Sequence, residues 1–290
     1  MLGRLVKEQL DERRIDYTAS GRELDVTNPR AIEAGAPSPA PGWVVNCSGY
    51  TAVDAAESEA DRAWAVNKDG PDSLARYCRR TGARLLHLST DYVFDGSDPH
   101  GYFEDAPTAP INTYGASKEA GERALRSELS EHVILRTAWL YAEHGRNFVL
   151  TMLRLLRDRG ELTVVNDQHG SPTYARDLAG AILAVTGSPE PVFGTFHFTN
   201  AGVTTWHRFA CEIRDQALEL GLISRRRQIR PISSAQFPTA AERPAYSVLT
   251  CRRIVETYAI EPRPWEEALG DCLRRIAAEQ GAKSYGTNYR

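Results

Sequence analysis

Short apolar runs alternate with long helical patterns through the first two thirds of the chain, and this alternation constrains the fold most. The apolar runs cover residues 43–46, 84–89 and 133–136, and each ends in small or polar residues. Such near-continuous runs are typical of strands that are covered on both faces. The segments 54–80 and 112–129 are rich in Ala, Glu and Arg and have the pattern of surface helices. The sequence therefore predicts an α/β fold with a doubly wound parallel sheet.

The alternation of apolar runs and helical patterns becomes irregular from about residue 139, which predicts a second, smaller α+β lobe. We expect helices at 148–159, 204–220 and 265–279, and strands at 162–165 and 195–199. The predicted division assigns 1–138 plus about 171–190 to a nucleotide-binding domain. It assigns about 139–170 plus 191–290 to a substrate-binding lobe.

Composition excludes several classes of function. The formal net charge is -3, with 25% charged residues, so the chain offers no basic surface for nucleic acid. No apolar run approaches the roughly 20 residues of a membrane helix, and the first residues have no signal-peptide pattern. We therefore expect a cytoplasmic protein without a membrane partner.

Cysteine and histidine spacing gives no sign of a disulfide framework or a metal site. The cysteines are odd in number and scattered, and none form a C-x-x-C pair, so we expect reduced and mostly buried side chains. The seven histidines contain no H-E-x-x-H pair, and no catalytic metal is predicted. The five cysteines are Cys47, Cys78, Cys211, Cys251 and Cys272.

Tyr114 and Lys118 stand four residues apart at the start of a predicted helix. That spacing places both side chains on one helical face, where they can act on one bound molecule. Most basic residues of the chain are arginine, yet position 118 is lysine, whose compact ammonium can approach both a phenol and a ribose. The alternative is an ordinary surface pair without a function.

Polar residues also follow two predicted strands. Thr90 begins the run Thr-Asp-Tyr-Val-Phe-Asp-Gly at the end of a buried strand, which is where open α/β sheets bind ligands. A hydroxyl there can hold a substrate carbonyl beside a phenol, although Thr90 could also only cap the strand end. Asn46, Cys47 and Ser48 end the preceding strand with small side chains that let a cofactor approach the backbone.

These motifs together resemble the extended short-chain dehydrogenases, and within them the dTDP-4-dehydrorhamnose reductases. The Tyr-x-x-x-Lys element marks only the superfamily, whereas Ser-Thr-Asp-Tyr-Val-Phe-Asp-Gly with Gly-Ser-Pro-Thr is much narrower. The matching segments span almost the whole chain: 1–4, 24–29, 51–54 with 56–57, 89–96, 114–118, 136–139, 167–168, 170–173 and 243–244.

The resemblance implies a Rossmann-type sheet and a role for each matching residue. Tyr114 would donate a proton, Lys118 would lower the Tyr114 pKa and bond the nicotinamide ribose, and Thr90 would position the C4 carbonyl. Hydride would come from the cofactor. Trp139, Asp91 and Tyr92 would line the sugar pocket, and Asp25 and Val26 would lie near the adenine. The resemblance also allows Mg²⁺ and suggests a homodimer.

Two features depart from the family pattern. Of the Gly-x-x-Gly-x-x-Gly turn that should precede the first helix, only Gly3 is present. A strand of about 5–6 residues and the early glycines are missing, and we expect them upstream of Met1. A truly shortened chain would bind its cofactor poorly. The second departure is Ala245-Tyr246-Ser247, where the family has Asn before Ser, and it leaves the identity of the sugar open.

Cofactor choice depends on charge near the ribose. Ser20, Gly21 and Arg22 follow a short segment predicted as the second strand. An acidic residue at this place would bond a ribose 2′-hydroxyl, whereas Arg accepts a 2′-phosphate. Arg22 therefore favours NADPH, with NADH also usable, unless it is only a solvated side chain.

Three functions fit these observations. The first is reduction of dTDP-4-dehydro-L-rhamnose to dTDP-L-rhamnose, and the second is reduction of another dTDP-4-keto-6-deoxyhexose. The third is a non-catalytic NADP-binding regulatory subunit, which the resemblance allows and which the presence of Thr90, Tyr114 and Lys118 disfavours.

Overall fold

A four-stranded parallel sheet organises the chain in the computed structural model, which describes residues 1–21 and 23–286. Its strands are β1 (Trp43–Asn46), β2 (Arg84–Thr90), β3 (His132–Thr137) and β8 (Gly194–His197), in the order β1-β2-β3-β8. The three apolar runs of the sequence are β1, β2 and β3, so the prediction of a parallel α/β sheet is confirmed.

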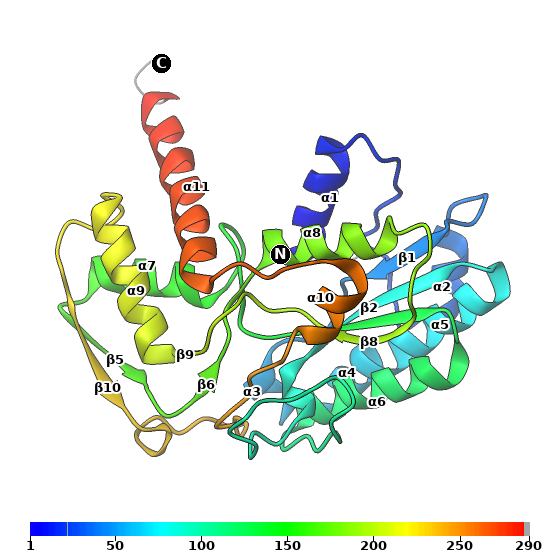
Figure 1. Ribbon diagram of the computed structural model, residues 1–290, viewed down its shortest axis with the longest axis horizontal. Coiled ribbons are helices and arrows are strands. Elements are labelled where there is room, and N and C mark those ends of the chain that lie inside the picture. Colours follow the sequence, from blue (N-terminus) through cyan, green and yellow to red (C-terminus); the bar gives the residue numbers. More distant parts are fainter. Residues whose placement is uncertain (22, 287–290) are drawn as a thin grey trace.

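Helices cover both faces of this sheet (Figure 1). On one face α5 (Gly70–Thr81) and α6 (Thr113–Glu128) pack on β2, with α2 (Pro29–Gly35) outside α5. On the other face lie α1 (Leu2–Glu12) and α8 (Ala175–Thr186), which contact each other. β2 contributes to both cores, because Leu86 and Leu88 face α8 whereas Leu85 faces α5. This two-faced burial explains the continuous apolar pattern of the strand.

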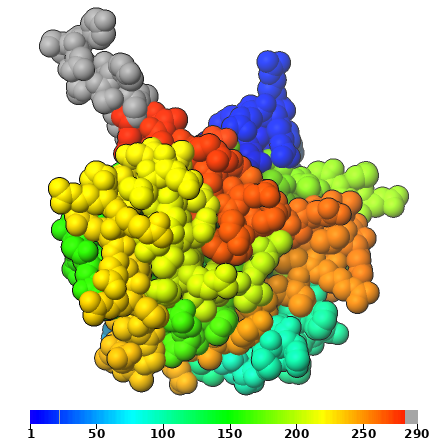
Figure 2. Space-filling view, turned by 60° about the vertical axis from the view of Figure 1, so that its left-hand side comes forward, coloured from blue at the N-terminus to red at the C-terminus, as the bar shows by residue number. Residues whose placement is uncertain are grey.

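The second lobe has its own core, formed by α7 (Phe148–Asp158), α9 (Trp206–Glu219) and α11 (Trp265–Gly286). The parallel pair β5 (Glu161–Val165) and β10 (Gln228–Ile232) packs against α9. Figure 2 shows α9 and the start of α11 forming one continuous surface, with the N-terminal segment standing out from the molecule. Two elements from residues 191–290, β8 and α10 (Arg252–Tyr258), pack with the sheet core instead.

Short bridges join the two parts. They are β4 (Leu140–Tyr141) with β7 (Thr173–Tyr174), in parallel, and β6 (His169–Gly170) with β9 (Thr204–Thr205), antiparallel. Two-residue strands leave no periodicity in a sequence, so the pattern of apolar residues did not reveal them. The β4–β7 pair connects the segment after β3 to the segment before α8, and the β6–β9 pair connects that same segment to the start of α9.

The long helix predicted over 54–80 is divided. It consists of α3 (Val53–Ala56), α4 (Ala60–Trp64), a π-helical turn at Ala65–Asp69 and α5, which begins at Gly70-Pro71. In the turn, the amide of Asn67 bonds the backbone of Tyr50 and the hydroxyl of Ser117. Local helical propensity contains no information about such tertiary hydrogen bonds. The sequence pattern therefore predicted one continuous helix where the structure has several shorter ones.

The strand predicted before Ser20 is not formed, and that prediction was wrong. Residues 15–20 have no regular secondary structure, and no strand pairs with the outer edge of β1 in the part of the chain that the structure describes. The backbone N–H and C=O groups of a strand need hydrogen-bond partners on a neighbouring strand, and residues 15–20 have no such neighbour among the described residues.

Candidate active site

Thr90 is the last residue of β2, and its hydroxyl shapes the turn that follows. The Thr90 hydroxyl accepts a hydrogen bond from the Tyr92 backbone N–H at 3.2 Å and donates to Asp91 Oδ1 at 3.0 Å. Thr90 and Asp91 are both buried. Burial raises the pKa of Asp91 to about 6, and the hydroxyls of Ser247 and Thr90 oppose this shift. Thr90 therefore does cap the strand end, and its hydroxyl also lies among the other groups of the site.

Tyr114 comes close to this turn because α6 begins against it. Asn112 caps the helix by accepting a hydrogen bond from the Gly115 backbone N–H at 2.7 Å. A Cβ at Gly115 would lie 2.1 Å from the carbonyl oxygen of Tyr92, so only glycine permits this approach. The Tyr114 and Tyr92 rings then meet edge to face, with centroids 5.6 Å apart.

The Tyr114 phenol is held in its neutral form. Burial raises its pKa to about 12, the Thr90 hydroxyl lowers it, and the Asp91 charge raises it. An ionised phenol is costly in a buried place, so Tyr114 keeps its proton at neutral pH. The structure thus brings together a buried phenol and the hydroxyl of Thr90.

Lys118 lies one turn further along α6, and its side chain is also buried. Its Nζ donates to the carbonyl oxygen of Leu88 at 2.6 Å and lies 3.2 Å from His87 Nε2. Burial lowers the Lys118 pKa to about 8, and Glu122 acts in the opposite direction. His87 is therefore a residue of this site that motif spacing did not reveal.

Asn46, Cys47 and Ser48 form the carboxyl end of β1, beside β2. The register pairs Asn46 with His87, and Asn46 Nδ2 lies 3.0 Å from His87 Nδ1. Cys47 is exposed, unlike the mostly buried cysteine expected, whereas Cys78 and Cys272 are buried; all five cysteines are free. Gly3 of α1 meets this end of β1, because a Cβ at Gly3 would lie 3.5 Å from Cys47 Cβ.

Trp139 follows β3 in a left-handed backbone conformation, with φ of 47°. Its ring stacks on Trp206 at 3.6 Å between centroids, and a Cβ at Gly170 would lie 2.6 Å from it. Trp139 is thus fixed between the sheet and the second lobe. Sequence reasoning did not include Trp206, which is 67 positions away and became a neighbour only through the fold.

Arg243 connects the second lobe to the sheet domain. Its guanidinium forms a bidentate pair with Asp54, with N–O distances of 3.0 and 2.7 Å. The neighbouring Pro244 lies against Gly96, where a Cβ would approach within 2.5 Å. The departure at Tyr246 leaves the backbone pairing intact, because the Tyr246 N–H donates to the Gly96 carbonyl at 3.2 Å and the Ala245 carbonyl accepts from the His169 N–H at 2.8 Å.

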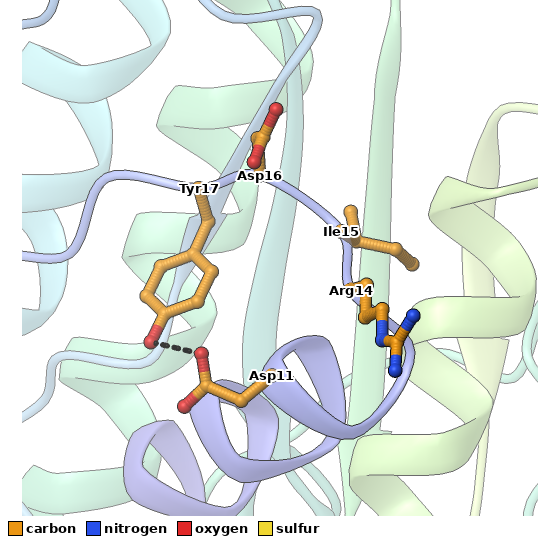
Figure 3. A pocket seen from close by; sticks show the side chains of 5 residues that line it. All are labelled: Asp11, Arg14, Ile15, Asp16 and Tyr17. Carbon is orange, nitrogen blue, oxygen red and sulfur yellow. Dashed lines mark hydrogen bonds between the residues drawn. The ribbon is translucent and has the colours of Figure 1, made fainter.

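The residues expected near an adenine, Asp25 and Val26, lie in the segment between α1 and α2. Asp25 accepts hydrogen bonds from the backbone and hydroxyl of Thr27, and Val26 packs against Gly70. Arg22 lies outside the described residues. A shallow hollow of about 350 Å³ lies where the segment after α1 turns back, and Tyr17 bonds Asp11 there at 3.0 Å (Figure 3). It contains none of the predicted catalytic residues.

Residues 1–21 and 23–286 contain no group of three or more His, Cys, Asp or Glu side chains that could hold a metal ion, so this part of the chain gives no support for the Mg²⁺ that the resemblance allows. Within the same residues, no helix is both long and apolar enough to cross a membrane.

A parallel sheet that presents Thr90 at a strand end beside Tyr114 and Lys118 on the next helix defines an extended short-chain dehydrogenase. Residues 1–278 match the family described as RmlD substrate binding domain. The dTDP-4-dehydrorhamnose reductase of Streptomyces griseus is 43% identical over 287 residues, 97% of this chain and 92% of that protein. The chain belongs to this family, the dTDP-4-dehydrorhamnose reductases.

Two further comparisons place it within the family. A probable dTDP-4,6-dihydroxy-2-methyloxan-3-one 4-ketoreductase of Streptomyces antibioticus is 43% identical over 285 residues, covering 97% of this chain and 94% of that protein. Among solved structures, the dTDP-4-dehydrorhamnose reductase of Bacillus anthracis in complex with NADP is 36% identical. Its TM-score is 0.86, over 94% of this chain and 95% of that chain.

Proposed function

We propose that the chain reduces the C4 ketone of dTDP-4-dehydro-L-rhamnose to give dTDP-L-rhamnose. The observation that carries this proposal is the meeting of Thr90, Tyr114 and Lys118 at the carboxyl end of β2. The family membership supports the same reaction. A non-catalytic role would give no reason for a buried phenol beside a buried amine.

Each residue of the trio has a distinct task in this proposal. The Thr90 hydroxyl holds the ketone oxygen, and the Tyr114 phenol donates the proton that this oxygen takes up. Lys118, when charged, stabilises the phenolate that remains on Tyr114. Asp91, Tyr92 and Trp139 are proposed to line the sugar pocket.

A nicotinamide cofactor would supply the hydride, and the end of β1 fits such a group. Small residues end β1 beside Gly3 of α1, which leaves room for a cofactor to approach the backbone. Asn46, Cys47 and Ser48 are proposed to border the cofactor, Lys118 to bond its ribose, and Asp25 and Val26 to lie near its adenine. A cytoplasmic location and a homodimer rest on the sequence and the family resemblance.

The proposed cofactor preference is for NADPH, because the Arg22 guanidinium can pair with the 2′-phosphate. In agreement, the relative from Bacillus anthracis is described in complex with NADP. Isothermal calorimetry should give tighter binding of NADPH than of NADH, with a difference of about tenfold or more that Arg22→Ala largely removes. Arg30→Ala, which changes an exposed arginine close by in the sequence, is the matched control. Equal affinities in the unmodified chain would refute the preference.

A second substrate is favoured by one specific observation. The relative from Streptomyces antibioticus, with a different 4-ketosugar in its name, is as similar to this chain as the reductase from Streptomyces griseus. Tyr246 also stands before Ser247, where the family pattern has Asn. The alternative is therefore reduction of another dTDP-4-keto-6-deoxyhexose by the same trio.

Product analysis with purified protein decides between these functions. The chain is supplied with NADPH and, in separate reactions, dTDP-4-dehydro-L-rhamnose and a 4-keto-6-deoxyhexose of different ring configuration. We expect dTDP-L-rhamnose as the product with the higher kcat/KM. A higher kcat/KM for the other sugar would support the alternative, and no NADPH oxidation with either sugar at saturating NADPH would contradict a reductase.

A further inference from the structure

A row of buried polar groups leads from the end of β1 to Lys118. Ser48 donates to Asn46 Oδ1 through its backbone N–H at 3.0 Å and its hydroxyl at 2.6 Å. Asn46 Nδ2 lies 3.0 Å from His87 Nδ1, and His87 Nε2 lies 3.2 Å from Lys118 Nζ. Asn46, His87 and Lys118 are all buried. No task assigned above uses Asn46 or His87 in this way.

The backbone N–H of Ser48 fixes the orientation of the Asn46 amide. A backbone N–H can only donate, so the atom facing it must be the amide oxygen of Asn46. The amide NH₂ then faces His87 Nδ1, and because an NH₂ is a donor, Nδ1 must be the accepting nitrogen. Burial, followed by the charges of Lys118 and His132, holds the pKa of His87 well below its usual range, so the ring is neutral. A neutral ring that accepts at Nδ1 carries its proton on Nε2.

That proton points toward Lys118. An ammonium has donors only, so a charged Lys118 would face a second donor across 3.2 Å, whereas a neutral amine can accept from Nε2–H and still donate to Leu88. A charged Lys118 requires the opposite His87 tautomer. That tautomer requires a turned Asn46 amide, which would leave the Ser48 backbone N–H without its acceptor.

We propose that His87 is a positioning residue whose tautomer, fixed by Asn46 and Ser48, favours the neutral amine of Lys118 and so sets the pH range in which that lysine carries charge. The row acts through Lys118 and touches neither the substrate nor the reacting oxygen. It couples the end of β1 to the proton-donating side of the site.

The other groups around Lys118 do not reverse this preference. From α6, Glu122 favours the charged amine, but its carboxylate is already shared between Arg136 and Arg126. Tyr114, one turn earlier on α6, stays neutral, and His132 of β3 acts on His87 rather than on the amine. The lowered Lys118 pKa of about 8 agrees with the geometry.

The first test reads the tautomer directly and does not depend on the proposed reaction. Nitrogen-15 NMR of histidine-labelled, cofactor-free protein distinguishes Nε2–H from Nδ1–H rings. The His87 signal is assigned by its loss in His87→Gln or, if that variant does not fold, from backbone connectivities. We expect the Nε2–H form of His87 at about pH 9.5, where Lys118 is neutral, and a ring that stays uncharged through the usual histidine titration range around 6.5. An Nδ1–H form at the same alkaline pH, or a ring that becomes charged in that usual range, would overturn the proposal.

The second test rests on the proposed function and measures the pH dependence of kcat/KM. His87→Gln can turn a carbonyl oxygen toward Lys118, which favours the ammonium, so activity should persist to higher pH. We expect the alkaline limb to move up by about one unit, since one unit corresponds to about 1.4 kcal/mol, the scale of one hydrogen bond. The exposed His100→Gln is the matched control and should leave the limb in place. A merely structural His87 would lower activity without moving the limb, and that outcome would contradict the proposal. If no substrate is reduced at all, the proposed function fails while the NMR result still stands.

Discussion

Replacing Tyr114 by Phe is expected to lower kcat by about 10²–10⁴-fold, the usual contribution of a general acid. The phenol is the proton donor of the proposed reduction, and it is buried beside Thr90 with its pKa raised to about 12. Removing one oxygen atom leaves the ring and its contact with Tyr92 in place, so the fold should not change. Steady-state kinetics with dTDP-4-dehydro-L-rhamnose and NADPH measure the effect.

Two other variants make this result specific. Tyr77→Phe removes a phenol from a buried helical tyrosine under the same sheet, and we expect an unchanged kcat. Lys118→Ala should lower both kcat and cofactor affinity, whereas Tyr114→Phe should leave the affinity close to normal. If Tyr114→Phe retained near-normal turnover, the proton donor would have to be another group, even though the family assignment would stand.

The sheet could be predicted because each of its strands carries its signal locally. A strand buried between two layers of helices must be apolar on both sides, so β1, β2 and β3 are visible as continuous runs. The start of α6 was also visible, since Asn112 and Gly115 lie within four residues of each other. What the sequence did not reveal depends on partners far away, as in the break of the helix at Asn67.

The same distinction applies to the site. Tyr114 and Lys118 share a helical face, and Thr90 ends a strand, so local rules were sufficient to select them. His87 lies between two leucines inside β2, so in the sequence it resembles an ordinary core residue. Its role depends on the register of β1 with β2, which pairs it with Asn46 across 41 positions. Local pattern contains no information about such a register until the strands are placed.

The largest expected loss of stability follows from Arg136→Met. Arg136 lies on β3 and holds Glu122 of α6 through two hydrogen bonds of 2.9 and 2.7 Å, with both side chains buried. Burial acts to raise the pKa of Glu122, but the hydrogen bonds and charge of Arg136 and the charge of Arg126 outweigh it, and the pKa lies below its usual value. Without Arg136 the buried carboxylate keeps only Arg126, a half-exposed partner, and loss of one partner of a buried pair costs about 3–5 kcal/mol.

Urea unfolding measures this loss as a shift of the midpoint at constant slope. Arg252→Met is the matched control, because its pair with Glu256 is exposed to solvent, and we expect the midpoint to stay nearly unchanged. The double variant Glu122→Leu/Arg136→Met removes the remaining carboxylate as well and should recover part of the stability.

The stabilisation by the Arg136–Glu122 pair also depends on pH. Because the pKa of Glu122 is lower in the folded than in the unfolded chain, the pair stabilises the fold above about pH 4, and this stabilisation is lost as the pH falls through the folded-state pKa. The gap between Arg136→Met and the unmodified chain should therefore narrow in acid. A gap that stayed constant down to pH 3 would show that Arg136 stabilises β3 and α6 by packing rather than by its charge.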